Sequence, residues 1–269
     1  MAHDEDAGNP DRQGESGKDA AVEALLERFV GDVRDALPLV ALWAHGSLAL
    51  GDFQPGRSDL DLIAVVAEDI TDAQRDRLRT LHRALTRDDP LSAKLHCSYI
   101  ATATLPETGH RHVTWAHQKL FARTVTEVSR RELALGGRCL YGPPPAELLP
   151  AVTDEELADF IRTELRGFWY PAAARRLDWL RDVWVDLGLV TVARATVTLR
   201  DGRLITKGEA LDLLTAELDA PPSVVHDIRD RRYGRPGAAR RRFDPLWRVE
   251  RARLARTFVR TGIERALER

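Results

Sequence analysis

The stretch from His45 to Val66, HGSLALGDFQPGRSDLDLIAVV, constrains the fold of this chain more than any other part of its 269 residues. An apolar run of strand length, LVALWA, leads into it at residues 39–44, and a second apolar run, LIAVVA, follows the sequence SDLD. Each run is typical of a buried strand. Between the two strands we expect a glycine-serine turn, a short helical segment and a loop that contains proline and glycine.

The residues at the two ends of this stretch predict a metal site beside a phosphate site. Side chains alternate along a strand, so Asp59 and Asp61 lie on one face. Two neighbouring carboxylates are costly to ionise together unless a cation neutralises them. Mg²⁺ takes one or two carboxylates together with phosphate oxygens. Where the chain leaves the first strand, backbone N–H groups at Gly46 and the hydroxyl of Ser47 could hold a phosphate.

The order Gly-Ser, then Asp-Leu-Asp, then an apolar strand resembles the signature with which members of the nucleotidyltransferase superfamily hold Mg-ATP. The resemblance implies that Asp59 and Asp61 are catalytic and bind Mg²⁺. It also implies that Gly46, Ser47 and Ser58 contact the nucleotide.

Composition sets broad limits on the kind of protein. The chain is 43% apolar and 30% charged, and its net charge of −2 gives no general attraction to nucleic acid or anionic membranes. Cys97 and Cys139 form no CxxC pattern, which favours reduced thiols in a cytoplasmic protein. No apolar stretch approaches the roughly 20 residues of a membrane span. The polar N-terminus lacks the apolar core of a signal peptide.

The first half of the chain mixes helical and strand patterns. Apolar residues at helical spacing predict a helix at 20–37, closed by Pro38. Thr71 can cap a second helix that runs to about residue 86. Alternation of polar and apolar residues predicts a third strand at 94–100. The next segments are expected to be a loop at 104–111, a helix at 113–124 and a short strand at 138–142.

The proline run at 143–145 is the expected domain boundary, because it continues neither helix nor strand. Helices begin at Thr153 and Thr206, and Asp201-Gly202 forms a turn. The expected fold class is therefore α+β: a disordered tail at 1–18, a mixed sheet with helices at 19–145, and an all-helical domain at 146–269. Clefts between domains commonly hold ligands, so we expect the nucleotide there.

The sequence TVARATVTLRDGRLITKGEA, residues 191–210, resembles the helical-domain motif of aminoglycoside adenylyltransferases of the streptomycin/spectinomycin type. The resemblance extends from about residue 20 over nearly the whole chain, at low identity outside the motifs. It implies that Arg194, Lys207 and Tyr233 contact ATP, and that Trp115 and Asp186 lie near the drug.

The charge and position of two of these residues support the implied contacts with ATP. Arg194 and Lys207 are cations on predicted helices, where a triphosphate would need counter-charge. Lys207 stands in the first turn of a helix, which is unfavourable for a cation and indicates an anionic ligand. The alternative is that both residues only solvate a helix surface.

One position departs from the family. The third carboxylate of these enzymes is a glutamate on the third strand that is thought to deprotonate the drug hydroxyl, and His96 stands there in this chain. An imidazole can act as a general base at neutral pH, but it cannot replace a carboxylate as a hard Mg²⁺ ligand. Alternatively, His96 is an ordinary strand residue and the base is Glu107 or absent. The departure leaves the acceptor itself open.

Two further groups of residues are weaker candidates. His110, His112 and His117 match no standard zinc spacing, and we expect them in a polar loop. The seven arginines between Arg229 and Arg242 could contact RNA phosphates, but the overall acidity favours a surface loop.

The sequence thus predicts a Mg²⁺-dependent enzyme that moves AMP from ATP to a hydroxyl of a small acceptor, with an aminoglycoside antibiotic as first candidate and antibiotic resistance as the consequence. The alternatives are a nucleotidyltransferase for another acceptor and a catalytically weakened nucleotide-binding or interaction protein. We expect a cytoplasmic monomer without nucleic-acid or membrane partners.

Overall fold

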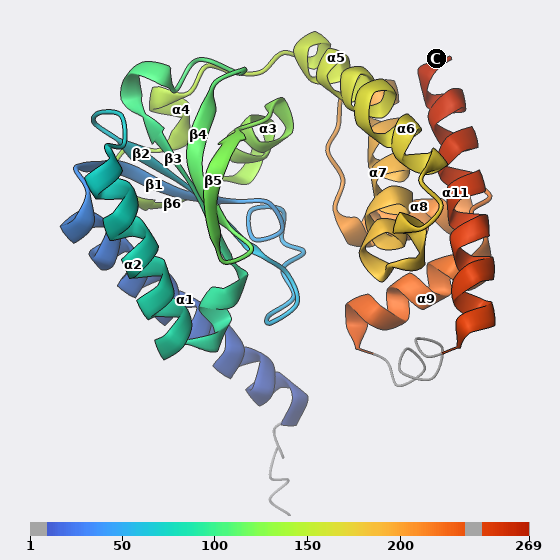
Figure 1. The fold of residues 1–269 in the computed structure, drawn as a ribbon, viewed down its shortest axis with the longest axis horizontal. Coiled ribbons are helices and arrows are strands. Elements are labelled where there is room, and N and C mark those ends of the chain that lie inside the picture. Colours follow the sequence, from blue (N-terminus) through green and yellow to red (C-terminus); the bar gives the residue numbers. More distant parts are fainter. Residues whose placement is uncertain (1–9, 235–243, 269) are drawn as a thin grey trace, which may run out of the picture. The chain divides into compact units, whose positions relative to one another are not determined.

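The computed structural model describes residues 10–234 and 244–268, which form two compact units (Figure 1). The chain divides between residues 151 and 152, six residues after the boundary expected from the proline run. Each unit has its own hydrophobic core.

The first unit contains a six-stranded mixed sheet with the strand order β5-β4-β3-β2-β1-β6. Only β2 and β3 pair in parallel, and every other pair of neighbours is antiparallel. The strands are β1 (Leu39–His45), β2 (Leu60–Val66), β3 (Leu95–Ala101), β4 (Arg111–Ala116), β5 (Lys119–Thr124) and β6 (Arg138–Tyr141). The first three agree with the strands expected from apolar runs and alternation.

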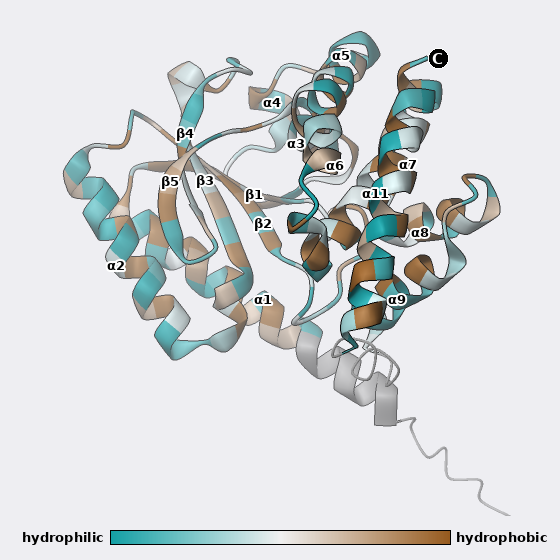
Figure 2. Ribbon diagram, turned by 45° about the vertical axis from the view of Figure 1, so that its right-hand side comes forward, coloured by the Kyte–Doolittle hydropathy of each residue, from teal (hydrophilic) through white to brown (hydrophobic). Residues whose placement is uncertain are grey.

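Helices cover both faces of this sheet (Figure 1). On one face lie α1 (Pro10–Ala36) and α2 (Asp72–Asp88), and on the other α3 (Glu127–Gly136) and α4 (Pro145–Leu148). The run LIAVVA is apolar throughout because β2 is buried on both sides: Leu62 and Ala64 face α1 and α2, while Ile63 and Val65 face α3. The outer surface of α2 is hydrophilic (Figure 2).

The expectation for the N-terminus needs correction. Helix α1 begins at Pro10, so the disordered tail expected at 1–18 is wrong for residues 10–18, and residues 1–9 lie outside the described part.

Short 3₁₀ helices at Pro90–Lys94 and Thr102–Thr104 flank β3.

The helix expected at 113–124 is a β-hairpin instead. Strands β4 and β5 pair along their length, and His117 and Gln118 turn the chain with positive φ values of 50° and 59°. Positive φ at both central residues matches the right-handed twist of a hairpin. The β-branched and aromatic residues of the segment VTW also favour a strand over a helix. The helix in this part of the chain is α3, which follows the hairpin and has Thr126 as its N-cap.

The second unit is all-helical, as expected. Its elements are α5 (Asp154–Glu164), a π-helical turn (Leu165–Trp169), α6 (Tyr170–Ala174), a 3₁₀ turn (Asp178–Leu180), α7 (Asp182–Asp201), α8 (Lys207–Ala216), α9 (Pro222–Tyr233) and α11 (Pro245–Leu267). Capping boxes at Thr153 and Thr206 start α5 and α8, and Gly202 ends α7 in the left-handed conformation. No helix in the described residues is long and apolar enough to cross a membrane.

A buried aromatic group joins α2 to the sheet. The ring of His82 stacks on Trp115 at 4.6 Å, and its Nε2 is 2.7 Å from the hydroxyl of Tyr99. Trp115 is only 2% exposed, so it fills the core and is not available to a drug. We therefore leave Trp115 out of the proposed substrate site.

This buried histidine predicts acid sensitivity. Burial lowers the pKa of His82 from 6.5 to about 3, so the unfolded chain binds a proton that the folded protein excludes. The stabilisation is fully present above pH 6.5 and falls by up to about 1.4 kcal/mol per pH unit as the pH drops toward 3. We expect calorimetry to show a melting temperature that falls with pH less steeply in His82→Gln than in the wild type.

His110→Gln is the control for this measurement, because His110 and its neighbour Glu107 are both exposed. It should keep the wild-type slope. An equally steep slope in His82→Gln would contradict the role assigned to His82.

Candidate active site

Three neighbouring strands bring His45, Asp61 and His96 side by side. In the register of the sheet, Asp61 pairs with His45 of β1 on one side and with His96 of β3 on the other. The Nδ1 atom of His96 lies 3.4 Å from Oδ1 of Asp61. His96 therefore faces away from Leu95 and Cys97, which lie in the core on the other side of the sheet, and toward the aspartate.

Asp59 and Asp61 offer the carboxylates that a Mg²⁺ site needs. Asp59 directly precedes β2, and the side chains of the two aspartates are 38% and 35% exposed. The Nζ atom of Lys94 lies 3.3 Å from Oδ1 of Asp59. Such a pair fits an ion that keeps several waters and takes phosphate oxygens. Within the described residues, no group of three or more His, Cys, Asp or Glu side chains is arranged to hold a metal ion.

The turn after β1 approaches Asp61 closely. Gly46 has a φ of +66°, and a Cβ atom there would lie 2.8 Å from Oδ2 of Asp61. The next residues form turns in place of the expected short helix, with the Leu50 N–H donating to the carbonyl of Gly46. Ser47 is partly exposed in this turn. A glycine is therefore required beside the aspartate.

Ser58 supports the loop that leads to the aspartates. Its side chain is buried, and its Oγ accepts a hydrogen bond of 3.0 Å from the backbone N–H of Gln54. Its nucleotide contact stays a prediction.

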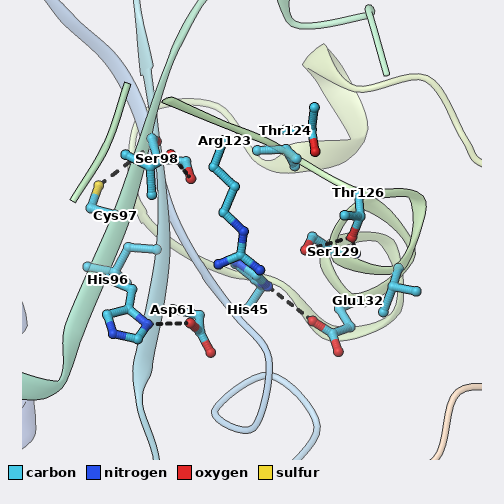
Figure 3. A pocket seen from close by; sticks show the side chains of 14 residues that line it. His45, Asp61, His96, Cys97, Ser98, Arg123, Thr124, Thr126, Ser129 and Glu132 are labelled. Atoms are coloured by element: carbon cyan, nitrogen blue, oxygen red, sulfur yellow. Dashed lines mark hydrogen bonds and ion pairs between the residues drawn. The ribbon is translucent and has the colours of Figure 1, made fainter. Parts of the chain in front are cut away.

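A cavity of about 240 Å³ opens beside Asp61, between the sheet and α3 (Figure 3). Sequence reasoning missed two of its charged residues. Glu132 of α3 is 6% exposed, and its Oε2 lies 3.1 Å from Nδ1 of His45. Arg123 of β5 extends into the cavity (Figure 3). Arg123 lies in the segment predicted as a helix at 113–124, and Glu132 lies in a segment for which no element was predicted. For Glu132, the sequence offers only an acidic residue next to an apolar one, Leu133.

The other titratable candidates, in β4, in the loop before it and in the turn after it, lie in different surroundings. Glu107, the alternative base, is 59% exposed and lies near His110. His112 is buried in β4, and burial lowers its pKa to about 4. His117, in the hairpin turn, packs its ring 4.7 Å from that of His96. His112 and His117 thus lie in a hairpin, whereas His110 lies in the loop before it, as expected.

The helical unit holds the remaining predicted residues. Arg194 lies on α7, Lys207 is the first residue of α8, and both are partly buried. Tyr233 ends α9 and is 40% exposed. Burial raises the pKa of Asp186, while its ion pair with Arg231 at 2.6 Å acts in the opposite direction. Most of the arginine-rich stretch, residues 235–242, lies outside the described residues.

The class to which this site belongs follows from sequence comparison. Residues 26–99 match the family model described as the nucleotidyltransferase domain. The match includes β1, the turn at Gly46, both aspartates and most of β3. The chain thus carries a nucleotidyltransferase domain, and the enzyme class expected from the sequence is confirmed.

A solved structure extends the comparison to both units. The fold is similar to the crystal structure of spectinomycin adenyltransferase AAD(9) from Enterococcus faecialis with ATP and spectinomycin. The TM-score is 0.64 at 17% identity, and the match covers 87% of this chain and 98% of that one. The expected α+β fold class is confirmed. No curated protein matches the sequence.

The close approach of Gly46 to Asp61 gives a test of the site. Gly46→Ala should lower nucleotidyltransferase activity by on the order of 10²-fold, because the new methyl group displaces the aspartate. Gly51→Ala is the matched control, since Gly51 has a φ of +69° and no atom within 4 Å of its added Cβ. Both variants should lose about 1–2 kcal/mol of stability from backbone strain. Equal activity in the two variants would show that the contact with Asp61 is unimportant.

Proposed function

We propose that the chain is a Mg²⁺-dependent adenylyltransferase that moves AMP from ATP to a hydroxyl group of a small acceptor. The observation that carries the proposal is the pair Asp59 and Asp61 next to the turn at Gly46 and Ser47. The acceptor oxygen bonds to the α-phosphorus as the bond from that phosphorus to the bridging oxygen breaks. Pyrophosphate then leaves, and the hydroxyl proton passes to a base.

The residues of the sheet unit have separate roles in this reaction. Asp59 and Asp61 would hold Mg²⁺, which neutralises triphosphate charge and stabilises the leaving pyrophosphate. Gly46 leaves room for Asp61 beside the phosphates, and Ser47 offers a hydroxyl to one of them. His96, whose Nδ1 lies near Asp61, is proposed as the base, with Nε2 as the proton acceptor.

Spectinomycin and streptomycin are the first acceptors to test. The similar crystal structure contains ATP and spectinomycin, and the motif at 191–210 resembles that of enzymes with such acceptors. His96 in place of the family glutamate keeps other hydroxylated acceptors in the proposal. A panel of both antibiotics and neutral sugars and cyclitols, with ATP and Mg²⁺, should give one product heavier by AMP.

The metal role of the aspartates can be tested by removing one charge at a time. Asp59→Asn and Asp61→Asn should each lower pyrophosphate release by about 10²–10⁴-fold, because several kcal/mol of transition-state stabilisation is lost. Asp72→Asn, at the exposed start of α2, should keep wild-type activity. Activity within a few-fold of wild type in both site variants would refute the metal role.

The proposed base is tested by two substitutions of His96. His96→Ala should lower turnover by ~10²–10⁴-fold, the usual contribution of a general base. His96→Glu should restore transfer, because it supplies the carboxylate of the family at the same place. His110→Ala, outside the cavity, should have no effect. Full turnover in His96→Ala would show that His96 is not the base and has only a structural role in β3.

The nucleotide contacts of the helical unit are also part of the proposal. Arg194 and Lys207 would supply counter-charge for the triphosphate, with Tyr233 as a further contact. Lys207→Ala and Arg194→Ala should weaken ATP binding in calorimetry by roughly tenfold each, and neither should change the melting temperature by more than a few degrees. Unchanged affinity in both variants would remove this unit from ATP binding.

A further inference from the structure

Two imidazoles flank Asp61, and the proposed function uses only His96. The other, His45, ends β1 and is hydrogen-bonded to Glu132 of α3. We propose that Glu132 and His45 form a binding pair that receives a hydroxyl group of the acceptor. The inference rests on the proposed function and adds to it the residues that hold the acceptor.

The hydrogen bond between the two residues determines which nitrogen of His45 can bind a ligand. An ionised carboxylate only accepts hydrogen bonds, so Nδ1 of a neutral His45 must carry the hydrogen. The distance of 3.1 Å to Oε2 of Glu132 fits that bond. The lone pair of Nε2 then remains to accept a hydrogen from a hydroxyl group. Glu132 is thus a positioning residue, and His45 makes the contact.

The burial of Glu132 is hard to explain by packing alone. Its side chain is 8% exposed on α3, where the next residue, Leu133, is buried in the apolar core. A buried carboxylate costs stability unless it is paired and hydrogen-bonded. The hydrogen bond to His45 offsets part of this cost and fixes the orientation of His45 beside Asp61.

The size and polarity of the cavity indicate what enters it. About 240 Å³ is less than the usual volume of a pocket for a whole drug-sized ligand, and has room for about one ring. Its wall includes five residues with side-chain hydroxyl groups: Ser98, Thr114, Thr124, Thr126 and Ser129. Such a wall suits a ring with several hydroxyl groups.

The charges of the cavity disfavour a phosphate group. Two carboxylates, Asp61 and Glu132, line it against one guanidinium, that of Arg123 (Figure 3). Asp61 is assigned to Mg²⁺, which would offset its charge, so the carboxylate of Glu132 is the like charge that a phosphate would meet in this partly enclosed space. The cavity therefore fits the hydroxylated ring of the acceptor better than the triphosphate of ATP.

The test compares Glu132→Gln and His45→Gln with the wild type and with Glu127→Gln, a matched change on α3 outside the cavity lining. Pyrophosphate release is measured with ATP, Mg²⁺ and whichever of spectinomycin, streptomycin, myo-inositol or glucose the wild type modifies fastest. We expect the KM for that acceptor to rise about tenfold in both cavity variants, the effect of losing about one well-placed hydrogen bond. The KM for ATP and kcat should stay within about threefold of wild type.

Nitrogen NMR of the imidazoles gives a second readout. In the wild type, His45 should be protonated on Nδ1. In Glu132→Gln the amide can donate to Nδ1, so the population should shift toward protonation on Nε2. A residue with only a packing role would not change this signal. If Glu132→Gln does not fold, the kinetic test rests on His45→Gln, because His45 is partly exposed.

Three results would overturn the inference: an unchanged KM for the acceptor, a KM that rises for ATP in its place, or a kcat that falls at constant KM. The first would show no role in binding, the second a nucleotide contact and the third a base. A wild-type protein that releases no pyrophosphate with any acceptor would instead overturn the proposed function, and the inference with it.

Discussion

The pairing of β2 with β1 on one side and β3 on the other is the constraint on which the site depends. It places Asp61 between two imidazoles, each from a different strand, at the start of a strand that is otherwise buried on both faces. The register allows little variation, because a shift of one residue would turn the carboxylate of Asp61 into the apolar core beneath α1 and α2. The cost of burying that charge therefore helps to hold the aspartate in place.

The turn at Gly46 also positions the residues that are expected to contact phosphates. Gly46 leaves β1 with a left-handed conformation and passes the carboxylate of Asp61 so closely that a Cβ atom would displace it. The turn at Gly46 thus brings the residues expected to contact phosphates next to the residues expected to bind the metal. On the opposite side of the sheet, His82, Tyr99 and Trp115 fix α2, while the site lies on the face that α3 covers.

The motif and the strands around it were predictable from sequence, because long apolar runs and the order of Gly-Ser and Asp-Leu-Asp report local geometry directly. The neighbourhood of His96 was also predictable from strand alternation. The contribution of Glu132 was not, since it depends on where α3 packs on the sheet and not on any local pattern. The hairpin at 111–124 was missed because a short apolar segment fits a helix and a strand almost equally well until its partner strand is known.

The single parallel pair in the sheet has a consequence for how the site forms. Antiparallel neighbours can be joined by a tight turn, but β2 and β3 require the crossover through α2. Asp61 and His96 therefore meet only after the chain between them has closed a long loop and docked its helix, and loop closure opposes that step until the contacts of α2 form. Chemical competence is in this sense a late event of folding, and substitutions in the buried face of α2 would delay the appearance of activity without touching a single residue of the site.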